Sequence, residues 1–203
     1  MPPAHPEPGR PATASDSAFA GRRVLVGVCG GIAAYKTCHV VSALAQAGAE
    51  VSVAMTESAT RFVTPLTFQA LSGRPVFTSQ WDQLDDADPQ HVRMATGLDL
   101  AIVAPCTMNT AARLVAGFAD DAVTAILAAL DRSRTPVLLA PSMNAEMWGQ
   151  PSNQRNLAVL RDDGFDVIEP GEGWQACRRS GPGRLPEPGE LLAAIESRLP
   201  STG

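Results

Sequence analysis

The amino-acid sequence predicts a single-domain α/β fold built around a doubly wound parallel sheet. Short apolar runs without polar alternation recur along the chain, as is typical of parallel strands that are buried on both faces. Segments with helical periodicity separate these runs, and this alternation indicates strand–helix–strand crossovers. At 203 residues the chain has the length of one domain, and no repeat or change of composition marks an internal boundary.

The predicted strands and helices alternate in chain order. The apolar runs that predict strands are RRVLVGV at 22–28, EVSVAM at 50–55, LDLAIVAP at 98–105, PVLLAP at 136–141 and FDVIEP at 165–170. The helical patterns occupy residues 32–48, 66–73, 107–130, 152–164 and 188–199. Residues 1–21 are rich in Pro, Ala and Ser and carry few large apolar side chains, so we expect a disordered tail before a folded domain at 22–203.

Composition narrows the classes of partner. Sixteen Lys and Arg against 21 Asp and Glu give a net charge of −5, and there is no dense basic run. This composition does not favour nucleic acid or a membrane surface as a binding partner. No apolar run reaches the ~18 residues that a membrane span needs, and the N-terminus lacks a signal-peptide pattern, so we expect a cytoplasmic protein. The cysteines and histidines show no metal-ligand spacing, which argues against a metal site and against a disulfide framework.

A glycine-rich turn follows the first predicted strand. In GVCGGIAAYKT, Gly27, Gly30 and Gly31 precede a predicted helix, and glycines at such a point let the backbone approach an anion at the helix N-terminus. The pattern is neither of the two common phosphate-binding fingerprints, because Tyr35 stands where the second glycine of a P-loop would be. A tight strand-to-helix turn is the alternative explanation.

Small and hydroxyl residues also follow two further predicted strands. Thr56 and Ser58 come after residues 50–55, and APCTMNT places Asn109 after residues 98–105. N-capping of the helices that follow is the alternative explanation for such residues. Because three strand ends at one edge of a parallel sheet carry them together, a mononucleotide in the shared crevice is the economical interpretation.

The segment APSMNAEMWGQP, at 140–151, directly follows the predicted strand at 136–141. Residues just past the carboxyl end of such a strand are candidates for contacting a ligand. The alternative is that Asn144 caps a short helix while Met143, Met147 and Trp148 fill the core.

Two isolated residues are candidates for a functional role. His91 lies shortly before the strand at 98–105 in a segment of weak periodicity, and a satisfied surface or core histidine is the alternative. Cys177 lies at 169–191 in EPGEGWQACRRSGPGRLPEPGEL, a long glycine-interrupted loop without predicted secondary structure, which is typical of a lid. A surface loop with an incidental thiol is the other interpretation of that segment.

Together these motifs resemble the flavin-dependent cysteine decarboxylases. PSMNAEMW at 141–148 matches that family's PxMNxxMW signature, and GGIAAYK, APCTMN, HVRMA and ACRRSGPGR occur in the family's order. The resemblance covers residues 22–199. It implies a Rossmann-like or flavodoxin-like flavoprotein fold, FMN as cofactor, and a homo-oligomer, a trimer or an assembly of trimers, with FMN near the subunit interface.

The resemblance also implies roles for the matching residues. His91 would be the active-site base beside the flavin, and Cys177 would be the proton donor on a flap that closes over the substrate. Asn144 would bind the substrate's carboxylate and amide in a pocket walled by Met143 and Met147. The residues implied to contact FMN are Gly30, Gly31, Ile32, Thr56, Ser58, Phe62, Ala104, Pro105, Cys106, Thr107 and Asn109.

The implied activity is decarboxylation of a C-terminal cysteine. Within the family, similarity is greatest to the branch that converts 4′-phosphopantothenoylcysteine to 4′-phosphopantetheine in coenzyme A biosynthesis. Oxidation of the thiol to a thioaldehyde would provide an electron sink for loss of CO₂, and the resulting enethiolate would then be reduced and protonated. One departure is that Arg178 and Arg179 follow Cys177 where many members have Gly and an acidic residue, and with Arg184 they are candidates for binding the substrate phosphate.

Three other functions share parts of this pattern. A peptidyl-cysteine decarboxylase of antimicrobial-peptide maturation has the same motifs. A flavin prenyltransferase has a related fold but typically lacks PxMNxxMW. A non-catalytic flavin-binding regulatory protein often lacks one catalytic residue, whereas His91, Asn144 and Cys177 are all present in this sequence.

Overall fold

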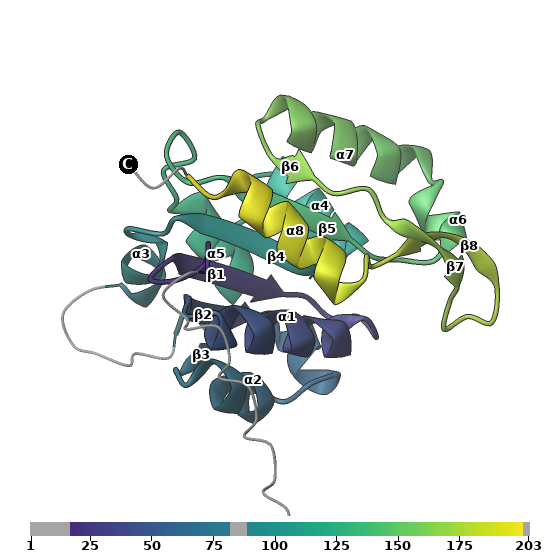
Figure 1. Ribbon diagram of the computed structural model, residues 1–203. Coiled ribbons are helices and arrows are strands. Elements are labelled where there is room, and N and C mark those ends of the chain that lie inside the picture. Colours follow the sequence, from purple (N-terminus) through teal and green to yellow (C-terminus); the bar gives the residue numbers. More distant parts are fainter. Residues whose placement is uncertain (1–16, 82–88, 201–203) are drawn as a thin grey trace, which may run out of the picture.

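The computed structural model describes residues 17–81 and 89–200 (Figure 1). Its strands are β1 (Arg23–Val28), β2 (Glu50–Met55), β3 (Val76–Phe77), β4 (Leu100–Cys106), β5 (Val137–Pro141), β6 (Asp166–Val167), β7 (Gly171–Trp174) and β8 (Ser180–Arg184). The helices are α1 (Ala34–Gln46), the 3₁₀ helix η2 (Glu57–Arg61), α2 (Pro65–Ser72), α3 (Gln90–Ala95), α4 (Met108–Val115), α5 (Ala122–Ala128), α6 (Ala145–Trp148), α7 (Pro151–Asp162) and α8 (Pro188–Arg198). No described helix is long and apolar enough to cross a bilayer.

Six of the strands form one parallel sheet in the order β3-β2-β1-β4-β5-β6. The predicted doubly wound α/β fold is therefore confirmed, and the order is that of Rossmann folds rather than the 2-1-3-4-5 order of flavodoxin. β1 pairs with β2 on one side and with β4 on the other, so the strand order reverses next to β1. Ligands of such sheets bind at this switch point, outside the carboxyl ends of the strands.

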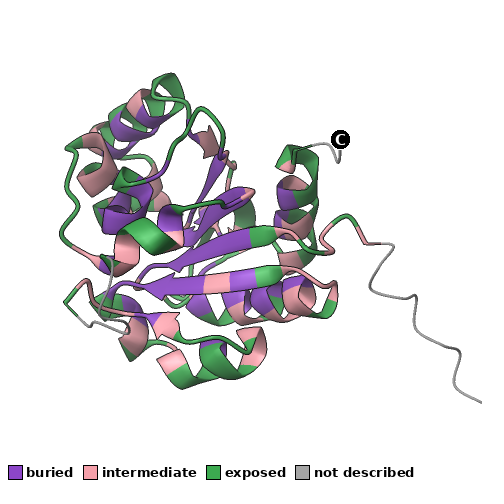
Figure 2. Ribbon diagram, turned by 90° about the vertical axis from the view of Figure 1, so that its left-hand side faces the viewer, coloured by how far each residue is buried: buried purple, intermediate pink, exposed green. Residues whose placement is uncertain are grey.

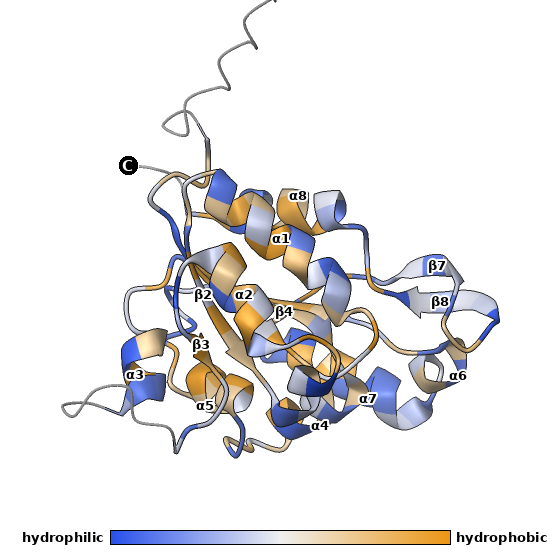
Figure 3. Cartoon of the chain, turned by 90° about the horizontal axis from the view of Figure 1, so that it is seen from below, coloured by the Kyte–Doolittle hydropathy of each residue, from blue (hydrophilic) through white to orange (hydrophobic). Residues whose placement is uncertain are grey.

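Helices cover both faces of the sheet, and the strands between them are buried (Figure 2). One hydrophobic cluster joins α1, α2 and α8 to residues such as Val26 and Ile102. The other joins α4, α5 and α7 to residues such as Leu25 and Val103. Figure 3 shows α1 and α8 on one side of the strands and α4, α5 and α7 on the other. Neighbouring residues of a strand serve opposite clusters because successive side chains point to opposite faces.

The helical pattern at 107–130 is interrupted, and the segment forms the two helices α4 and α5. Gly117 adopts a φ of 72° just after α4, a left-handed conformation that ends helices and suits glycine. Asp121 then begins α5 with a capping box, since its side chain accepts from the backbone N–H of Thr124 while Thr124 Oγ1 accepts from the backbone N–H of Asp121. The apolar periodicity continues across the break and so does not reveal it.

The prediction of a loop without regular structure at 169–191 is wrong. β7 and β8 form an antiparallel hairpin apart from the main sheet. These strands are rich in glycine and poor in β-branched residues, so strand propensity does not signal them. Gly183 lets β8 lie against the segment after β5, because its carbonyl accepts from Met143 N at 2.9 Å and a Cβ at Gly183 would collide with the Met143 carbonyl oxygen.

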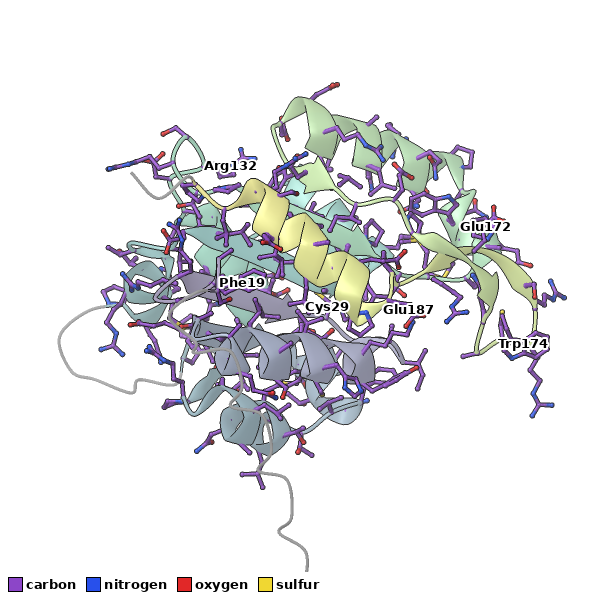
Figure 4. All side chains as sticks on the ribbon, in the orientation of Figure 1. Phe19, Cys29, Arg132, Glu172, Trp174 and Glu187 are labelled. Carbon is purple, nitrogen blue, oxygen red and sulfur yellow. The ribbon has the colours of Figure 1, made fainter. Side chains whose placement is uncertain are left out.

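The first described residues connect the predicted tail to the domain. Phe19 packs against the hydrophobic cluster that includes α1 and α8 (Figure 4). Gly21 N donates to Gly48 O at 2.9 Å. Residues 1–16 of the predicted tail lie outside the described residues.

Candidate active site

A cavity of about 720 Å³ lies at the carboxyl edge of the main sheet. The turns after β1, β2, β4 and β5 bound it together with the β7–β8 hairpin. The predicted site residues that line it are Gly30, Gly31, Ile32, Thr56, Ser58, Thr107, Asn109, Met143, Asn144, Met147, Cys177 and Arg184. The residues predicted for a flavin and those predicted for a substrate therefore share one space.

The turn between β1 and α1 brings backbone close to this cavity. A Cβ at Gly30 would lie 2.8 Å from the carbonyl carbon of Ser58, so only glycine fits between the two turns. A Cβ at Gly31 would meet no atom within 4 Å, and Gly31 lines the cavity. No side chain caps the first turn of α1, which leaves room for an anion at its start, although Ala34 N and Lys36 N already donate to Gly31 O and Ala33 O at 3.0 Å.

Hydroxyl groups from the next two turns also line the cavity. Thr56 Oγ1 accepts from Ala59 N at 3.2 Å, and Thr107 Oγ1 accepts from Thr110 N at 3.2 Å. The capping alternative is therefore correct for both threonines. Capping uses the hydroxyl oxygen as an acceptor, which leaves the Thr56 proton to donate to a ligand. The Thr107 proton is directed at Thr110 Oγ1, 3.1 Å away, because the Thr110 hydroxyl donates to Cys29 Sγ at 3.2 Å.

Asn144 begins α6 at the end of the turn after β5. Its Oδ1 accepts from Met147 N at 2.8 Å, so the predicted alternative of a capped short helix is confirmed. The accompanying idea that the neighbouring apolar side chains fill the core is wrong, because no residue of α6 is buried and Met147 is 40% exposed. With Oδ1 occupied, the Asn144 amide N–H groups remain as donors toward the cavity.

The hairpin presents Cys177 and the arginines. Cys177 is exposed, and its Sγ lies 3.6 Å from Gln175 Oε1 as a donor. Arg178 has a φ of 63°, a left-handed conformation in which glycine would be unstrained. Arg179 pairs with Glu146 of α6 at 2.6 Å, and Arg184 pairs with Glu187 at 3.1 Å.

Several lining residues were not predicted from the sequence. Lys36 of α1 is buried, and its Nζ donates to Glu187 Oε1 at 2.7 Å and to Leu185 O at 3.3 Å. Glu187 lies at the start of α8 (Figure 4). The hydrogen bond from Lys36 holds the pKa of the Glu187 carboxyl below its ordinary value. Lys36 belongs to the GGIAAYK motif, and this membership is the only feature of the sequence that could have pointed to it as a site residue. The other unpredicted residues include Gln175, Trp174, Arg113 and Asp120.

Four predicted flavin contacts do not line the cavity, namely Phe62, Ala104, Pro105 and Cys106. Ala104 and Cys106 are at most 1% exposed inside β4, each in the cluster on one face of the sheet. Burial raises the pKa of the Cys106 thiol well above its ordinary value and that of Cys29 to about 12, so neither thiol is suited to proton transfer. Contact of these four residues with a flavin stays a prediction.

His91 also lies outside the cavity within one chain. His91 belongs to α3, and only four residues separate the end of α3 from the amino end of β4. There Asp99 Oδ2 accepts from the backbone N–H of Arg23, the first residue of β1, at 2.8 Å. Figures 1 and 3 place α3 and the β7–β8 hairpin at opposite ends of the sheet. The role of His91 stays a prediction.

Comparison with sequenced proteins shows similarity to coenzyme A biosynthesis bifunctional proteins CoaBC. The chain is 47% identical over 178 residues to the protein of Bacillus subtilis (strain 168) and 49% identical over 180 residues to that of Mycolicibacterium smegmatis. These alignments cover 88% and 89% of this chain, but 43% and 42% of the relatives. The chain therefore spans less than half the length of these relatives.

Solved structures of similar fold include the FMN-dependent cysteine decarboxylase SpaF. Its TM-score is 0.76 at 31% identity, covering 89% of this chain and 96% of SpaF. A PPC decarboxylase mutant complexed with pantothenoylaminoethenethiol has a TM-score of 0.77 at 27% identity, covering 87% of this chain and 97% of that one. The flavoprotein family model matches residues 13–200. That match includes every strand and helix from β1 to α8, and the chain therefore belongs to the flavoprotein family.

Proposed function

We propose that this chain is an FMN-dependent decarboxylase that converts 4′-phosphopantothenoylcysteine to 4′-phosphopantetheine in coenzyme A biosynthesis. The observation that carries the proposal is the single cavity around which the β1–α1 glycine turn, Asn144 and Cys177 are gathered. The similarity to CoaBC proteins and to PPC decarboxylase supports this choice of substrate.

The residues at the carboxyl edge of the sheet fit FMN. The close packing of Gly30 on Ser58 leaves the backbone of the β1–α1 turn accessible to a phosphate beside the uncapped start of α1. Thr56 and Asn109 add side-chain donors, and Thr107 also lines the cavity. FMN would supply the two-electron oxidation of the substrate thiol that creates a sink for the electrons of decarboxylation, and it would return those electrons later.

Asn144 is suited to hold the substrate carboxylate. Its Oδ1 is committed to Met147 N, so the amide N–H groups are the part of the side chain available to a ligand. A neutral amide orients the carboxylate without the strong ion pair that would stabilise the charge before it departs as CO₂. Met143 and Met147 provide apolar walls on either side of Asn144.

Cys177 is suited to supply the proton that replaces CO₂. Departure of CO₂ leaves its bonding electron pair in an enethiolate of the substrate. A proton on the carbon that lost the carboxylate, with a hydride on its neighbour, then gives the saturated thiol product. Cys177 lines the cavity from the turn of the hairpin, and the β1–α1 turn lines the same cavity.

His91 would act as the base that accepts the thiol proton when the substrate is oxidised. Because α3 lies away from the cavity of its own chain, we propose that His91 of one subunit serves the cavity of a neighbour in a homotrimer. We further propose that this trimer works in the cytoplasm, where the other steps of the pathway would deliver its substrate.

The arginines of the hairpin favour a phosphorylated substrate. Arg184 lines the cavity, and Arg178 and Arg179 extend from the turn between the same two strands. Guanidinium groups bind phosphate with paired hydrogen bonds, which suits an anionic ligand on a protein of net charge −5. The similarity to SpaF keeps a second candidate open, a decarboxylase whose cysteine is the C-terminus of a peptide.

Incubation of the purified FMN-loaded protein with 4′-phosphopantothenoylcysteine tests the proposal. We expect release of CO₂ and formation of 4′-phosphopantetheine. Mass spectrometry detects the product. The dephosphorylated substrate and a short peptide ending in cysteine serve as competitors. Faster turnover of the peptide would establish the second candidate, and turnover of neither would exclude both.

A further inference from the structure

Gln175 is a buried side chain in an otherwise exposed part of the molecule. It is 8% exposed, whereas Trp174, Ala176, Cys177 and Arg178 around it are exposed. Gln175 lies between β7 and the turn that carries Cys177, and it lines the cavity. A buried amide requires hydrogen-bond partners, and the partners of this one connect three parts of the site.

The amide nitrogen of Gln175 points at backbone carbonyl groups. Nε2 donates to Pro182 O at 2.7 Å, and it lies 3.4 Å from Met143 O and 3.5 Å from Gly181 O. The first and third of these carbonyls belong to β8, and the second to the segment between β5 and α6. Three acceptors around one nitrogen fix which end of the amide is the donor.

The amide oxygen of Gln175 points the other way, at two donors. Oε1 accepts from Ala145 N at 3.2 Å and from Cys177 Sγ at 3.6 Å. Ala145 directly follows Asn144. One side-chain oxygen therefore connects the residue next to the proposed carboxylate ligand with the thiol of the proposed proton donor.

The backbone of Gln175 closes the turn on which Cys177 lies. Gln175 N donates to Arg179 O at 2.8 Å, and Arg178 N donates to Gln175 O at 2.9 Å. Cys177 is thus held in a tight turn whose two ends meet at Gln175. Backbone bonds fix the shape of the turn, and the side chain fixes where the turn lies relative to residues 143–145.

We propose that Gln175 is a positioning residue that holds the Cys177 turn against the Met143–Ala145 segment, so that thiol and Asn144 keep one relative placement. This inference rests on the proposed function for the roles of Cys177 and Asn144. This arrangement suits a substrate whose carboxylate is bonded to the carbon that is later protonated. Gln175 touches neither reacting atom in this role and acts through its two neighbours.

The test compares Gln175→Met and Gln175→Glu with the unaltered FMN-loaded chain. Methionine keeps the length of the side chain and removes the hydrogen bonds of the side-chain amide, whereas the backbone bonds of residue 175 remain possible. Glutamate keeps an acceptor for Ala145 N–H but turns a second oxygen toward three carbonyl groups, where it repels them. Gln154→Met is the matched control, because Gln154 also donates to a backbone carbonyl, that of Trp148 at the end of α6 at 2.6 Å, yet does not line the cavity.

Hydrogen exchange followed by mass spectrometry reports on the two segments without any substrate. In Gln175→Met we expect exchange at 175–179 and at Ala145 to rise by at least ~10-fold together, since several mutually supporting hydrogen bonds are lost. In Gln175→Glu exchange at 175–179 should rise as well, but exchange at Ala145 should rise less because its N–H keeps an acceptor. Exchange in β1 and β4 should stay unchanged, which shows that the domain is folded. Alkylation of Cys177 by iodoacetamide should be faster in Gln175→Met, and Gln154→Met should change none of these.

Unchanged exchange at Ala145 in Gln175→Met, or equal changes in Gln154→Met, would overturn the positioning role. Turnover of 4′-phosphopantothenoylcysteine by Gln175→Met should fall at least ~10-fold while FMN binding, measured by fluorescence, stays intact. If the unaltered chain has no turnover although the exchange results hold, the proposed function fails and the role of Gln175 in placing the turn stands.

Discussion

At the level of single residues, Asn144 combines a structural and a binding task in one amide. Its oxygen caps α6 and its nitrogen is left for a ligand. The structural alternative and the functional interpretation of PSMN are therefore compatible, because each uses a different atom. Thr56 follows the same logic, with the oxygen as the cap and the proton as the donor, whereas the Thr107 hydroxyl donates to Thr110 Oγ1.

Asn144→Asp and Cys177→Ser should fail in different ways. Aspartate preserves the cap on α6, but its charge repels the substrate carboxylate, so neither flavin reduction nor CO₂ release is expected. Cys177 is needed only after CO₂ has left, so Cys177→Ser should release CO₂ and accumulate reduced flavin with an unsaturated thiol product. Anaerobic rapid-mixing absorbance of the flavin separates the two. Equal bleaching in both variants, or normal product from Cys177→Ser, would refute this division of roles.

Gly30→Ala and Gly31→Ala form a matched pair within one turn. The new methyl group at position 30 would overlap Ser58 backbone, so we expect a loss of about 1–3 kcal/mol in the free energy of unfolding. The methyl group at position 31 enters open space in the cavity, so stability should change by less than ~0.5 kcal/mol while FMN affinity falls. Urea unfolding and FMN titration measure the two effects. A destabilised Gly31→Ala with normal FMN affinity would contradict the assignment of the turn.

At the level of elements, the β7–β8 hairpin carries its own strain at Arg178. The left-handed conformation of a non-glycine residue, here at a φ of 63°, destabilises the folded state by about 1–2 kcal/mol. A glycine avoids this strain, but it loses more backbone entropy on folding, which costs about 0.5–1 kcal/mol. The first term is larger, so the hairpin turn should accept Arg178→Gly without loss. Arg179 does not adopt a left-handed conformation, so glycine at this position would relieve no strain. Its side chain also pairs with Glu146.

We therefore expect the hairpin of Arg178→Gly to be more stable than that of Arg179→Gly by at least ~1 kcal/mol. Native-state hydrogen exchange of the β7–β8 amides measures the difference. The reverse order would mean that the Arg178 side chain makes an interaction that outweighs its backbone strain.

The contact between α1 and α8 depends on pH through Glu187. The hydrogen bond from Lys36 lowers the folded-state pKa of this carboxyl, so its stabilising effect is present above the unfolded-state pKa and is lost as pH falls through the folded-state pKa. Glu187→Gln should lower the Tm at neutral pH, and the difference from the unaltered chain should vanish in acid. Thermal unfolding across pH tests this, with Glu196→Gln on the same helix as control. A difference in Tm that persists in acid would point to packing rather than charge.

The elements that the sequence predicted well are those whose burial is continuous. β1, β4 and β5 are buried along almost their whole length, and their apolar runs stand out for that reason. β3 and α6 have two and four residues, too few for any period to be visible. The hairpin consists of glycine-rich strands held by Gln175, and neither feature leaves a hydrophobic pattern in the sequence.

At the level of the whole molecule, the doubly wound topology explains why most site residues were predictable. Residues that follow parallel strands meet at one edge, so Gly31, Thr107 and Asn144 share a cavity although they are far apart in the chain. That rule does not apply to His91, which precedes β4 and lies toward the amino edge. Under the proposed function its place beside a flavin would depend on another subunit, about which periodicity within one chain carries no information.

Subunit complementation tests whether the site is shared between chains. If His91 of one subunit serves the cavity of its neighbour, a His91→Asn chain and a Cys177→Ser chain are each inactive, yet together they can form an intact site. One cavity then takes Cys177 from the first variant and His91 from the second. In a closed trimer assembled at random from equal amounts, about a quarter of the sites are intact, so roughly a quarter of the original activity should return. The measurement is product formation after the two variants are unfolded, mixed and refolded together, with each variant refolded alone as control. Should the mixture stay inactive although sedimentation shows trimers, His91 and Cys177 do not meet across an interface. The base would then have to be sought among the residues that line the cavity of a single chain.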